Sequence, residues 1–409
     1  MMRRVKRNTG LVILVALVAL LFLVNPLKLF QDRAGAGRPP AVDAAVLDSL
    51  AQAAAASART PEDYLLACFS AHDIVFLGEF FKISQNVKLV SALIPRLAAA
   101  GVWNLGIEYA LSDSQADIDA LLAAPAWDET RARAIFLDWI PTWGYQEYLD
   151  ILRAAWEVNR GRAPGHPRFR VAGLNVRQDW SLLKTDRDAR DPSIVRRIYA
   201  RGIPDAHMAD VILREFVDTN QKALVFCGTQ HALTRFRSRE YEKSAADMKL
   251  SETRRTGNIV FDRIGARAFT VLLHSPWPDS RARGGLAWAA DGVIDALIGK
   301  LPDGGTEAGW DTAGTALGSI PITSGSYRTG YASLTLAELC DGYIVQGPLA
   351  GYKVVTPIPD FVPAHRAEEA VRNFPGVKQP GLTLEGVNQA ILEDVRAVDA
   401  MLAPFRPRR

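Results

Sequence analysis

The amino-acid sequence predicts an α/β fold with a mainly parallel central sheet covered by helices. Three apolar segments carry this prediction: residues 73–79 (DIVFLGE), 104–108 (NLGIE) and 223–228 (ALVFCG). Each is short, continuous and flanked by helical patterns, which is typical of strands buried on both faces of a parallel sheet. Because strands and helices alternate along the chain, we expect one α/β domain with inserted helices.

The segments between and after these strands predict the remaining elements. Apolar residues recur at helical spacing over 85–100, where Pro95 is expected to bend the helix. Helical segments are also expected over 112–159, with an interruption near Pro141. The other expected elements are strands at 168–174, 258–261, 269–273 and 342–346, helices within 193–219, a closing helix at 384–402, and loops over the Gly-, Thr- and Ser-rich segment 302–331.

Composition is that of an ordinary globular protein and excludes some functions. Of 409 residues, 48% are hydrophobic and 23% charged, and the net charge is +3. The basic residues are scattered, so we expect no nucleic-acid partner. Cys68, Cys227 and Cys340 form no CxxC pair, which excludes a cysteine-type zinc site. Free thiols are the default interpretation, and a Cys68–Cys340 disulfide is the alternative.

The N-terminus has the pattern of a membrane signal. Four basic residues among the first seven precede an unbroken apolar run over 11–24. A basic segment followed by such a run is typical of a secretory signal. Small residues suited to cleavage lie well beyond the run, so we favour an uncleaved, single-pass signal anchor. The positive flank predicts a cytoplasmic N-terminus, with the folded part on the periplasmic or extracytoplasmic side of the inner membrane.

The chain therefore divides into four predicted parts. These are a signal anchor (1–30), a linker with an alanine-rich lead-in helix (31–60), the α/β domain (61–365), and a C-terminal helix with a basic tail (366–409). The sequence specifies no oligomeric state.

Three strand ends carry polar residues suited to a functional site. Glu79 and Glu108 end the first two strands, and His231 follows the third through a glycine. Ligands of open α/β sheets bind outside the carboxyl ends of the strands, so the three side chains are expected in one crevice with a small-molecule ligand.

Each of these residues also has a purely structural interpretation. Glu79, followed by two phenylalanines, is expected to retain its proton and to act as a general acid or base. The alternative is a helix cap or an ion pair with Lys82. Glu108 is expected to bind a metal or to pair with an arginine, since an unpaired buried carboxylate is costly.

Histidines provide the remaining candidates. His231 could ligate a metal or haem, or relay a proton, whereas its structural alternative is a loop histidine bonded to backbone. His274, at the end of the strand over 269–273, is the second choice. Asp205 is expected to be a helix N-cap. The sequence shows no Gly-rich phosphate loop, no His-Glu-x-x-His pair and no nucleophile elbow.

These motifs, in this order, resemble the superfamily of ChaN-like haem-binding proteins, erythromycin esterases and TIKI-type proteases. The matching segments are 75–79 (VFLGE), 105–108 (LGIE), 205–209 (DAHMA), 224–232 (LVFCGTQHA) and 341–345 (DGYIV). The resemblance covers about residues 61–361, and it implies that Glu79, Glu108 and His231 are polar pocket residues. They would act on an activated water in the esterase branch, assist a metal in the protease branch, or lie in a pocket linked to haem in the ChaN-like branch.

The sequence departs from the superfamily at one position. Phe81 stands where the first GxxH motif has its histidine, which argues against a two-histidine site for a divalent metal. We therefore expect a membrane-anchored, ChaN-like protein that binds haem or another small ligand, with His231 and His274 as candidate ligands. The alternative is a hydrolase that uses Glu79, Glu108 and His231 on an activated water.

Overall fold

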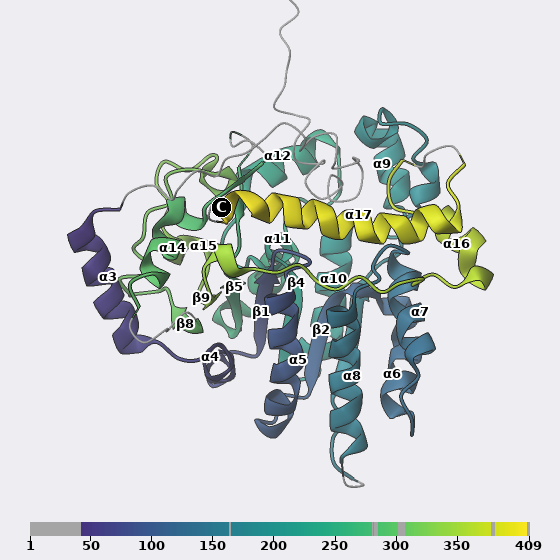
Figure 1. Cartoon of the computed structure of the whole chain (residues 1–409), viewed down its shortest axis with the longest axis horizontal. Helices are drawn as coiled ribbons and strands as arrows, with labels where there is room; N and C mark the ends of the chain where they lie inside the picture. Colours follow the sequence, from purple (N-terminus) through teal and green to yellow (C-terminus); the bar gives the residue numbers. More distant parts are fainter. Residues whose placement is uncertain are drawn as a thin grey trace, which may run out of the picture.

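The computed structural model describes residues 42–162, 165–279, 281, 285–301, 307–377 and 381–406. Within these residues the chain forms a seven-stranded sheet in the order β3-β2-β4-β1-β5-β9-β8 (Figure 1). All neighbours pair in parallel except β8, which runs antiparallel to β9 at one edge. The predicted α/β class with a mainly parallel sheet is therefore confirmed. The strands are β1 (Ile74–Glu79), β2 (Asn104–Leu111), β3 (Arg170–Asn175), β4 (Ala223–Gly228), β5 (Ala268–Leu273), β8 (Glu307–Asp311) and β9 (Gly342–Gln346), and a separate short pair joins β6 (Trp277–Pro278) to β7 (Leu286–Ala287).

One face of the sheet packs against helices from the first half of the chain. Alternate residues of β1, Val75 and Leu77, lie in one hydrophobic cluster with residues of these helices. Side chains of a strand point alternately to its two faces, which assigns Glu79 to this same face. The helices of this face are α4 (Pro61–Cys68), α5 (Ser84–Ala99), α6 (Gln115–Ala123), α7 (Glu129–Trp139) and α8 (Gln146–Arg160).

The other face packs against a second helical layer. Ile74 and Phe76 of β1 lie in a hydrophobic cluster with residues of α10, which fits the fully buried pattern of β1. A π-helical turn (Leu213–Val217) continues α10. The elements on and around this face are α9 (Pro192–Ile198), α10 (Pro204–Ile212), α11 (Thr229–Ala232), α12 (Arg239–Asp247) and α13 (Thr256–Ile264).

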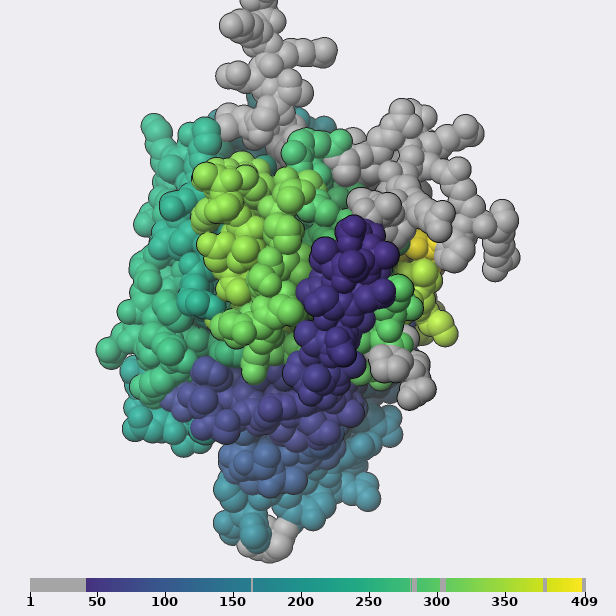
Figure 2. Space-filling view, turned by 90° about the vertical axis from the view of Figure 1, so that its left-hand side faces the viewer, coloured from purple at the N-terminus to yellow at the C-terminus, as the bar shows by residue number. Residues whose placement is uncertain are grey.

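The alanine-rich lead-in segment forms a helix that covers the β8–β9 edge. This helix, α3 (Ala44–Ser57), begins after Asp43, whose side chain accepts the N–H groups of Ala45 and Val46. Its buried alanines pack with Trp310 of β8, whose Nε1 donates to the carbonyl of Ala54 over 2.9 Å. Figure 2 shows α3 against the later part of the chain, where α14 (Val293–Ile298) and α15 (Leu336–Leu339) belong to the same cluster.

The C-terminal helices complete the molecule. Figure 1 shows the long helix α17 (Leu384–Leu402) crossing the molecule beyond the arrowheads of β1 and β4, after the short helix α16 (Ala367–Arg372). Val398 and Leu402 of α17 pack on Ile83, which directly precedes α5. The predicted closing helix is confirmed, and it covers the loop that follows β1.

Two predictions of secondary structure were wrong. The expected strand at 258–261 lies inside helix α13, because Asn258 caps this helix at Arg255 and a run of three apolar residues after it does not distinguish strand from helix. The segment 302–331 was expected to be loops, yet it contains β8. Pairing with β9 stabilises β8 as an edge strand. The strand contains Gly309 because a Cβ at this position would lie 2.6 Å from the ring of Tyr64.

The predicted signal anchor (1–30), most of the linker, and the last three residues of the basic tail lie outside the described residues. Across the described ranges, no helix has the length and apolar character needed to cross a membrane. The three cysteines are free and buried, as the default interpretation predicted.

Candidate functional site

Three neighbouring strands bring Glu79, Glu108 and His231 to the carboxyl edge of the sheet. Glu79 is the last residue of β1 and pairs in register with Gly228, the last residue of β4. One oxygen of Glu108 accepts the N–H of Gly228 over 2.8 Å, and the other lies 3.4 Å from Nε2 of His231. The exposed fractions are 1% for Glu79 and 6% for each of the other two. All three residues are therefore buried at this edge, and Glu108 and His231 are in contact.

His231 is held from its other side by Asp205. Nδ1 of His231 and Oδ1 of Asp205 are 2.6 Å apart. Asp205 was expected to cap a helix, but that prediction was wrong: it is the second residue of α10, whose N-cap is Ile203 and has no side-chain cap. Instead, the same Oδ1 accepts the N–H of Thr256 over 2.8 Å and its hydroxyl over 3.0 Å. The carboxylate of Asp205 therefore bonds both His231 and Thr256, the first residue of α13.

Arg255 balances the charge of Asp205 inside the protein. Its guanidinium Nη1 lies 3.1 Å from Oδ2 of Asp205, which also accepts the Tyr241 hydroxyl over 3.3 Å. The guanidinium carbon lies 3.3 Å from the centre of the Tyr241 ring, which is a close cation–π contact. Arg255 and Asp205 are both buried, so breaking their pair would leave an unmatched charge.

These neighbours determine the protonation of His231. Burial disfavours the charged imidazole, but the charges of Asp205 and then Glu108 outweigh it and raise the pKa of His231 above its usual 6.5. Burial likewise opposes ionisation of Asp205, yet the charges of His231 and Arg255 hold the pKa of this carboxyl well below its usual range. Both shifts favour an imidazolium between two carboxylates, with its Nδ1–H directed to Asp205.

Glu79 has a different environment on the opposite face of the sheet. Both of its oxygens lie 3.0 Å from the hydroxyl of Tyr148, which itself accepts the N–H of Lys82 over 3.0 Å. Burial raises the pKa of Glu79 well above 4.5, the hydrogen bond from Tyr148 opposes this shift, and the charge of Glu108 adds to it. The expectation that Glu79 retains its proton is therefore supported by its surroundings.

The structural alternative for Glu79 was an ion pair with Lys82, whose positive charge acts to lower the pKa of Glu79. The ammonium of Lys82 pairs with Asp394 of α17, and Asp394 also accepts the Tyr145 hydroxyl over 2.9 Å. The backbone of Lys82 has a φ of +68°, a conformation that is uncommon for a residue with a side chain. This turn directs the side chain of Lys82 to α17 and its N–H to Tyr148.

Phe81 lies between the end of β4 and the aromatic residues near Glu79. Its ring packs over Gly228, where a Cβ would come within 2.7 Å of the ring, and it meets the Trp143 ring edge-on at 5.5 Å. The absence of a side chain at Gly228 therefore makes room for Phe81. At the position where the superfamily has a histidine, this chain has a partly buried apolar ring.

His274 does not belong to this cluster. It is fully buried, its Nδ1 lies 2.9 Å from the hydroxyl of Tyr343, and its Nε2 lies 3.2 Å from Asp295. No contact recorded between the described residues joins it to Glu79, Glu108 or His231. Its partners belong to β9 and α14, so it connects elements on the other side of β1.

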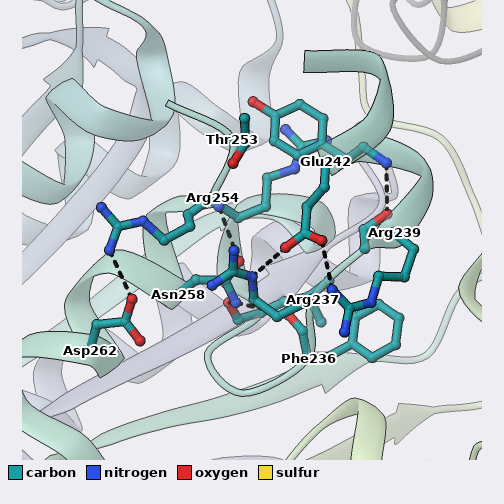
Figure 3. A network of polar contacts seen from close by, with 12 residues as sticks. Phe236, Arg237, Arg239, Glu242, Thr253, Arg254, Asn258 and Asp262 are labelled. Atoms are coloured by element: carbon teal, nitrogen blue, oxygen red, sulfur yellow. Dashed lines mark hydrogen bonds and ion pairs between the residues drawn. The ribbon is translucent and has the colours of Figure 1, made fainter. Parts of the chain in front are cut away.

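The loop that follows His231 is fixed by one amide. Nδ2 of Asn258 donates to the carbonyls of Leu233, Thr234 and Phe236 over 3.0, 2.8 and 2.8 Å, and Figure 3 shows Asn258 close to Arg237. The next residue, Arg237, bonds Glu242 of α12 over 2.6 Å. These bonds hold the short helix α11, and with it His231, against α13.

The donor set is a poor match for a metal or for haem as it stands. In the part of the chain that the structure describes, no group of three or more His, Cys, Asp or Glu side chains has an arrangement that could hold a metal ion. An axial haem ligand needs a free imidazole nitrogen. Both nitrogens of His231 face carboxylates, and those of His274 face Tyr343 and Asp295. Haem could bind only after one of these contacts opens.

Sequence reasoning missed Asp205, Arg255, Tyr148 and Tyr241. The segment that contains Asp205 was part of the motif resemblance, and this was the one signal that pointed to it. The others come from helices and helix starts whose sequences show only capping and packing patterns. Their roles depend on tertiary contacts that local patterns do not encode.

Comparison with known proteins gives a match to solved structures alone. Neither the family models nor the curated proteins that were compared match the sequence. A succinoglycan biosynthesis protein is 10% identical, with a TM-score of 0.50, over 74% of this chain and 97% of that chain. A mutant of erythromycin esterase EreC in its open conformation is 13% identical, with a TM-score of 0.40, over 69% and 92%. ChaN of Campylobacter jejuni, a haem-binding protein, is 13% identical, with a TM-score of 0.34, over 55% and 89%.

The first of these similarities shows a shared α/β fold. At these identities the similarity concerns the architecture, and the chemistry has to be argued from the residues of this chain.

Replacing Glu79 by glutamine should stabilise the protein at neutral pH. The pKa of Glu79 is raised in the folded state above the unfolded value of about 4.5, so the stability of the wild type falls as the pH rises from there towards the folded pKa. Glu79→Gln removes this loss, and we expect a gain on the order of 1 kcal/mol at pH 7. Below pH 4.5 the gain should vanish.

The measurement is the melting temperature of both proteins from pH 4 to pH 8. Glu147→Gln is the matched control, because Glu147 is also buried but accepts bonds from the Ser84 hydroxyl and the Thr356 N–H that need a carboxylate. The control should lose stability. A Glu79→Gln protein that is less stable than the wild type at pH 7 would show that Glu79 is ionised in the fold.

Proposed function

We propose that this protein is a hydrolase that cleaves an ester or related acyl bond by acid–base catalysis on a water molecule. One observation carries the proposal: His231 lies between Asp205 and Glu108, and a third carboxyl, Glu79, ends the neighbouring strand in an environment that favours its protonated form. Neighbouring titratable groups whose pKa values are shifted in different ways by their surroundings are typical of acid–base sites. The resemblance to the esterase branch of the superfamily supports the same function.

His231 is the proposed general base. When the imidazolium loses the proton on Nε2, the hydrogen bond to Asp205 keeps the remaining proton on Nδ1 and leaves Nε2 as the acceptor. A water held by Nε2 and Glu108 then gives a proton to Nε2 as its oxygen attacks the acyl carbon. Asp205 is a positioning residue, because it selects the tautomer and stabilises the charge that forms.

Glu79 is the proposed general acid. As the tetrahedral intermediate collapses, the bond between the acyl carbon and the leaving oxygen breaks, and Glu79 transfers its proton to that oxygen. The products are a carboxylic acid and an alcohol, and the two catalytic groups return to their starting states by proton exchange with solvent. General acid–base catalysis of this kind contributes about 100- to 10,000-fold.

Haem binding is the other function that the resemblance implies. It is the weaker proposal for this chain, because Nε2 of His231 faces Glu108 at 3.4 Å and Phe81 covers the adjoining glycine. Titration of the purified chain with haemin separates the two. We expect no saturable Soret shift of a histidine-ligated haem, and a one-to-one shift that His231→Gln removes would overturn the hydrolase proposal.

The leaving group of the substrate should reveal the role of Glu79. p-Nitrophenolate leaves without protonation, whereas an alkoxide does not. In a panel of p-nitrophenyl esters from acetate to octanoate with their ethyl counterparts, Glu79→Gln should lower kcat by about 100-fold or more for the ethyl esters, and far less for the p-nitrophenyl esters. His231→Gln should abolish both activities.

The pH dependence follows from the same assignments. For the wild type, kcat/KM should rise with pH through a pKa above 6.5, since the base form of His231 is required. For the ethyl esters alone, activity should also be lost at the pH at which Glu79 loses its proton. No turnover of any ester in the panel, or equal losses for both leaving groups, would contradict the proposal.

We also propose that the N-terminal segment anchors the protein in the inner membrane, with the folded part on the extracytoplasmic side. The support is the basic cluster followed by the apolar run over 11–24. The full chain should remain in the membrane fraction after alkaline extraction, and the chain from residue 42 should be soluble and melt cooperatively. A full chain in the soluble fraction, or a truncated chain that does not fold, would contradict this assignment.

A further inference from the structure

Tyr109 directly follows Glu108 in β2 but lies on the other face of the sheet. Successive side chains of a strand alternate between faces, so Glu108 points towards Asp205 and His231, and Tyr109 points towards the helices that flank Glu79. The ring of Tyr109 lies 4.6 Å from that of Tyr148, the hydrogen-bond partner of Glu79. It also stacks on the Trp143 ring at 5.7 Å. The phenol of Tyr109 therefore adjoins the proposed general acid.

The hydroxyl of Tyr109 is buried and has no hydrogen-bond partner among the described residues. A buried polar group without a partner costs about 1–3 kcal/mol, and phenylalanine would fill the same volume without this cost. The neighbouring Tyr148 differs, since its hydroxyl bonds Glu79 and the N–H of Lys82. Trp139, which lies 6.3 Å from the Tyr109 ring, is a second buried donor without an acceptor.

Burial and nearby acidic groups both act to keep the Tyr109 hydroxyl protonated. Burial raises the pKa of Tyr109 well above 10, and the charges of Glu79 and Glu108 raise it further. The phenol therefore keeps its proton and remains a hydrogen-bond donor at every pH at which the site would work. The Tyr109 hydroxyl is thus a donor without an acceptor near the proposed general acid. Such a donor is suited to stabilise negative charge that develops during a reaction.

We propose that Tyr109 is a catalytic residue of the hydrolysis, which donates its O–H to the acyl oxygen of the substrate. This inference rests on the proposed function. When water attacks the acyl carbon, the π pair of the carbonyl moves to the oxygen, and the Tyr109 hydrogen bond stabilises that oxyanion without transferring its proton. The π bond re-forms as the leaving oxygen departs with the proton from Glu79. The substrate class is then a neutral ester or lactone, because the site offers its carbonyl oxygen an uncharged donor.

Tyr109→Phe tests this role. Loss of one oxyanion donor typically costs about 100- to 1,000-fold in kcat, and we expect a loss of this size with little change in KM. Affinity for a hydrated trifluoromethyl ketone analogue of the ester should fall by a similar factor. The melting temperature should be unchanged or higher, since no hydrogen bond of the fold is lost.

Tyr352→Phe is the matched control, because Tyr352 is a buried tyrosine of the cluster beneath α17 whose hydroxyl also has no hydrogen-bond partner among the described residues. It should retain wild-type kcat. If the wild type hydrolyses esters but Tyr109→Phe keeps wild-type kcat and analogue affinity, the assignment of Tyr109 is wrong and the proposed function stands. A marked loss of stability in Tyr109→Phe would also reject it, because the hydroxyl would then have a structural partner. Absence of ester hydrolysis in the wild type would instead reject the proposed function.

Discussion

The contact between Asp205 and His231 holds together the helices on one face of the sheet. Asp205 belongs to α10, and its carboxylate receives bonds from His231 of α11, Tyr241 of α12 and Thr256 of α13. Four helices on one face of the sheet therefore meet at a single anion. Since Arg255 is its only buried cationic partner besides the histidine among the described residues, the charge balance of this region depends on the imidazole remaining in place.

The sheet separates two sets of proton-bearing groups. On one face, Asp205, Arg255 and His231 form a charged chain that ends at Glu108. On the other, Glu79 and the hydroxyls of Tyr148 and Tyr109 lie in an aromatic environment that favours neutral forms. The two sets meet where Gly228 has no side chain, and the ring of Phe81 lies over this position. A charged imidazolium and a neutral carboxylic acid can coexist here because their surroundings differ in polarity.

The sequence predicted the residues at the carboxyl ends of the strands better than the tertiary contacts that surround them. Short apolar segments that lead to Gly-Glu, Gly-x-Glu or Gly-x-x-His are local patterns, and they identified Glu79, Glu108 and His231 because parallel strands end at one edge. The expectation that Glu108 ends its strand was wrong, since β2 continues to Leu111. Asp205 lies 26 residues before the histidine it holds, so its role follows from the packing of α10 and not from any local signal. The same holds for α13, whose three apolar residues were interpreted as a strand. It also holds for β8, which forms by pairing with the edge strand β9.

The most direct test of this account is the protonation of His231, followed by ¹⁵N NMR of the imidazole from pH 5 to pH 9. The pKa of His231 should lie above 6.5, its proton should stay on Nδ1 in the neutral form, and Asp205→Asn and Glu108→Gln should each lower the pKa. A histidine that titrates below 6.5, or whose pKa does not respond to either substitution, would contradict the central role of the two carboxylates.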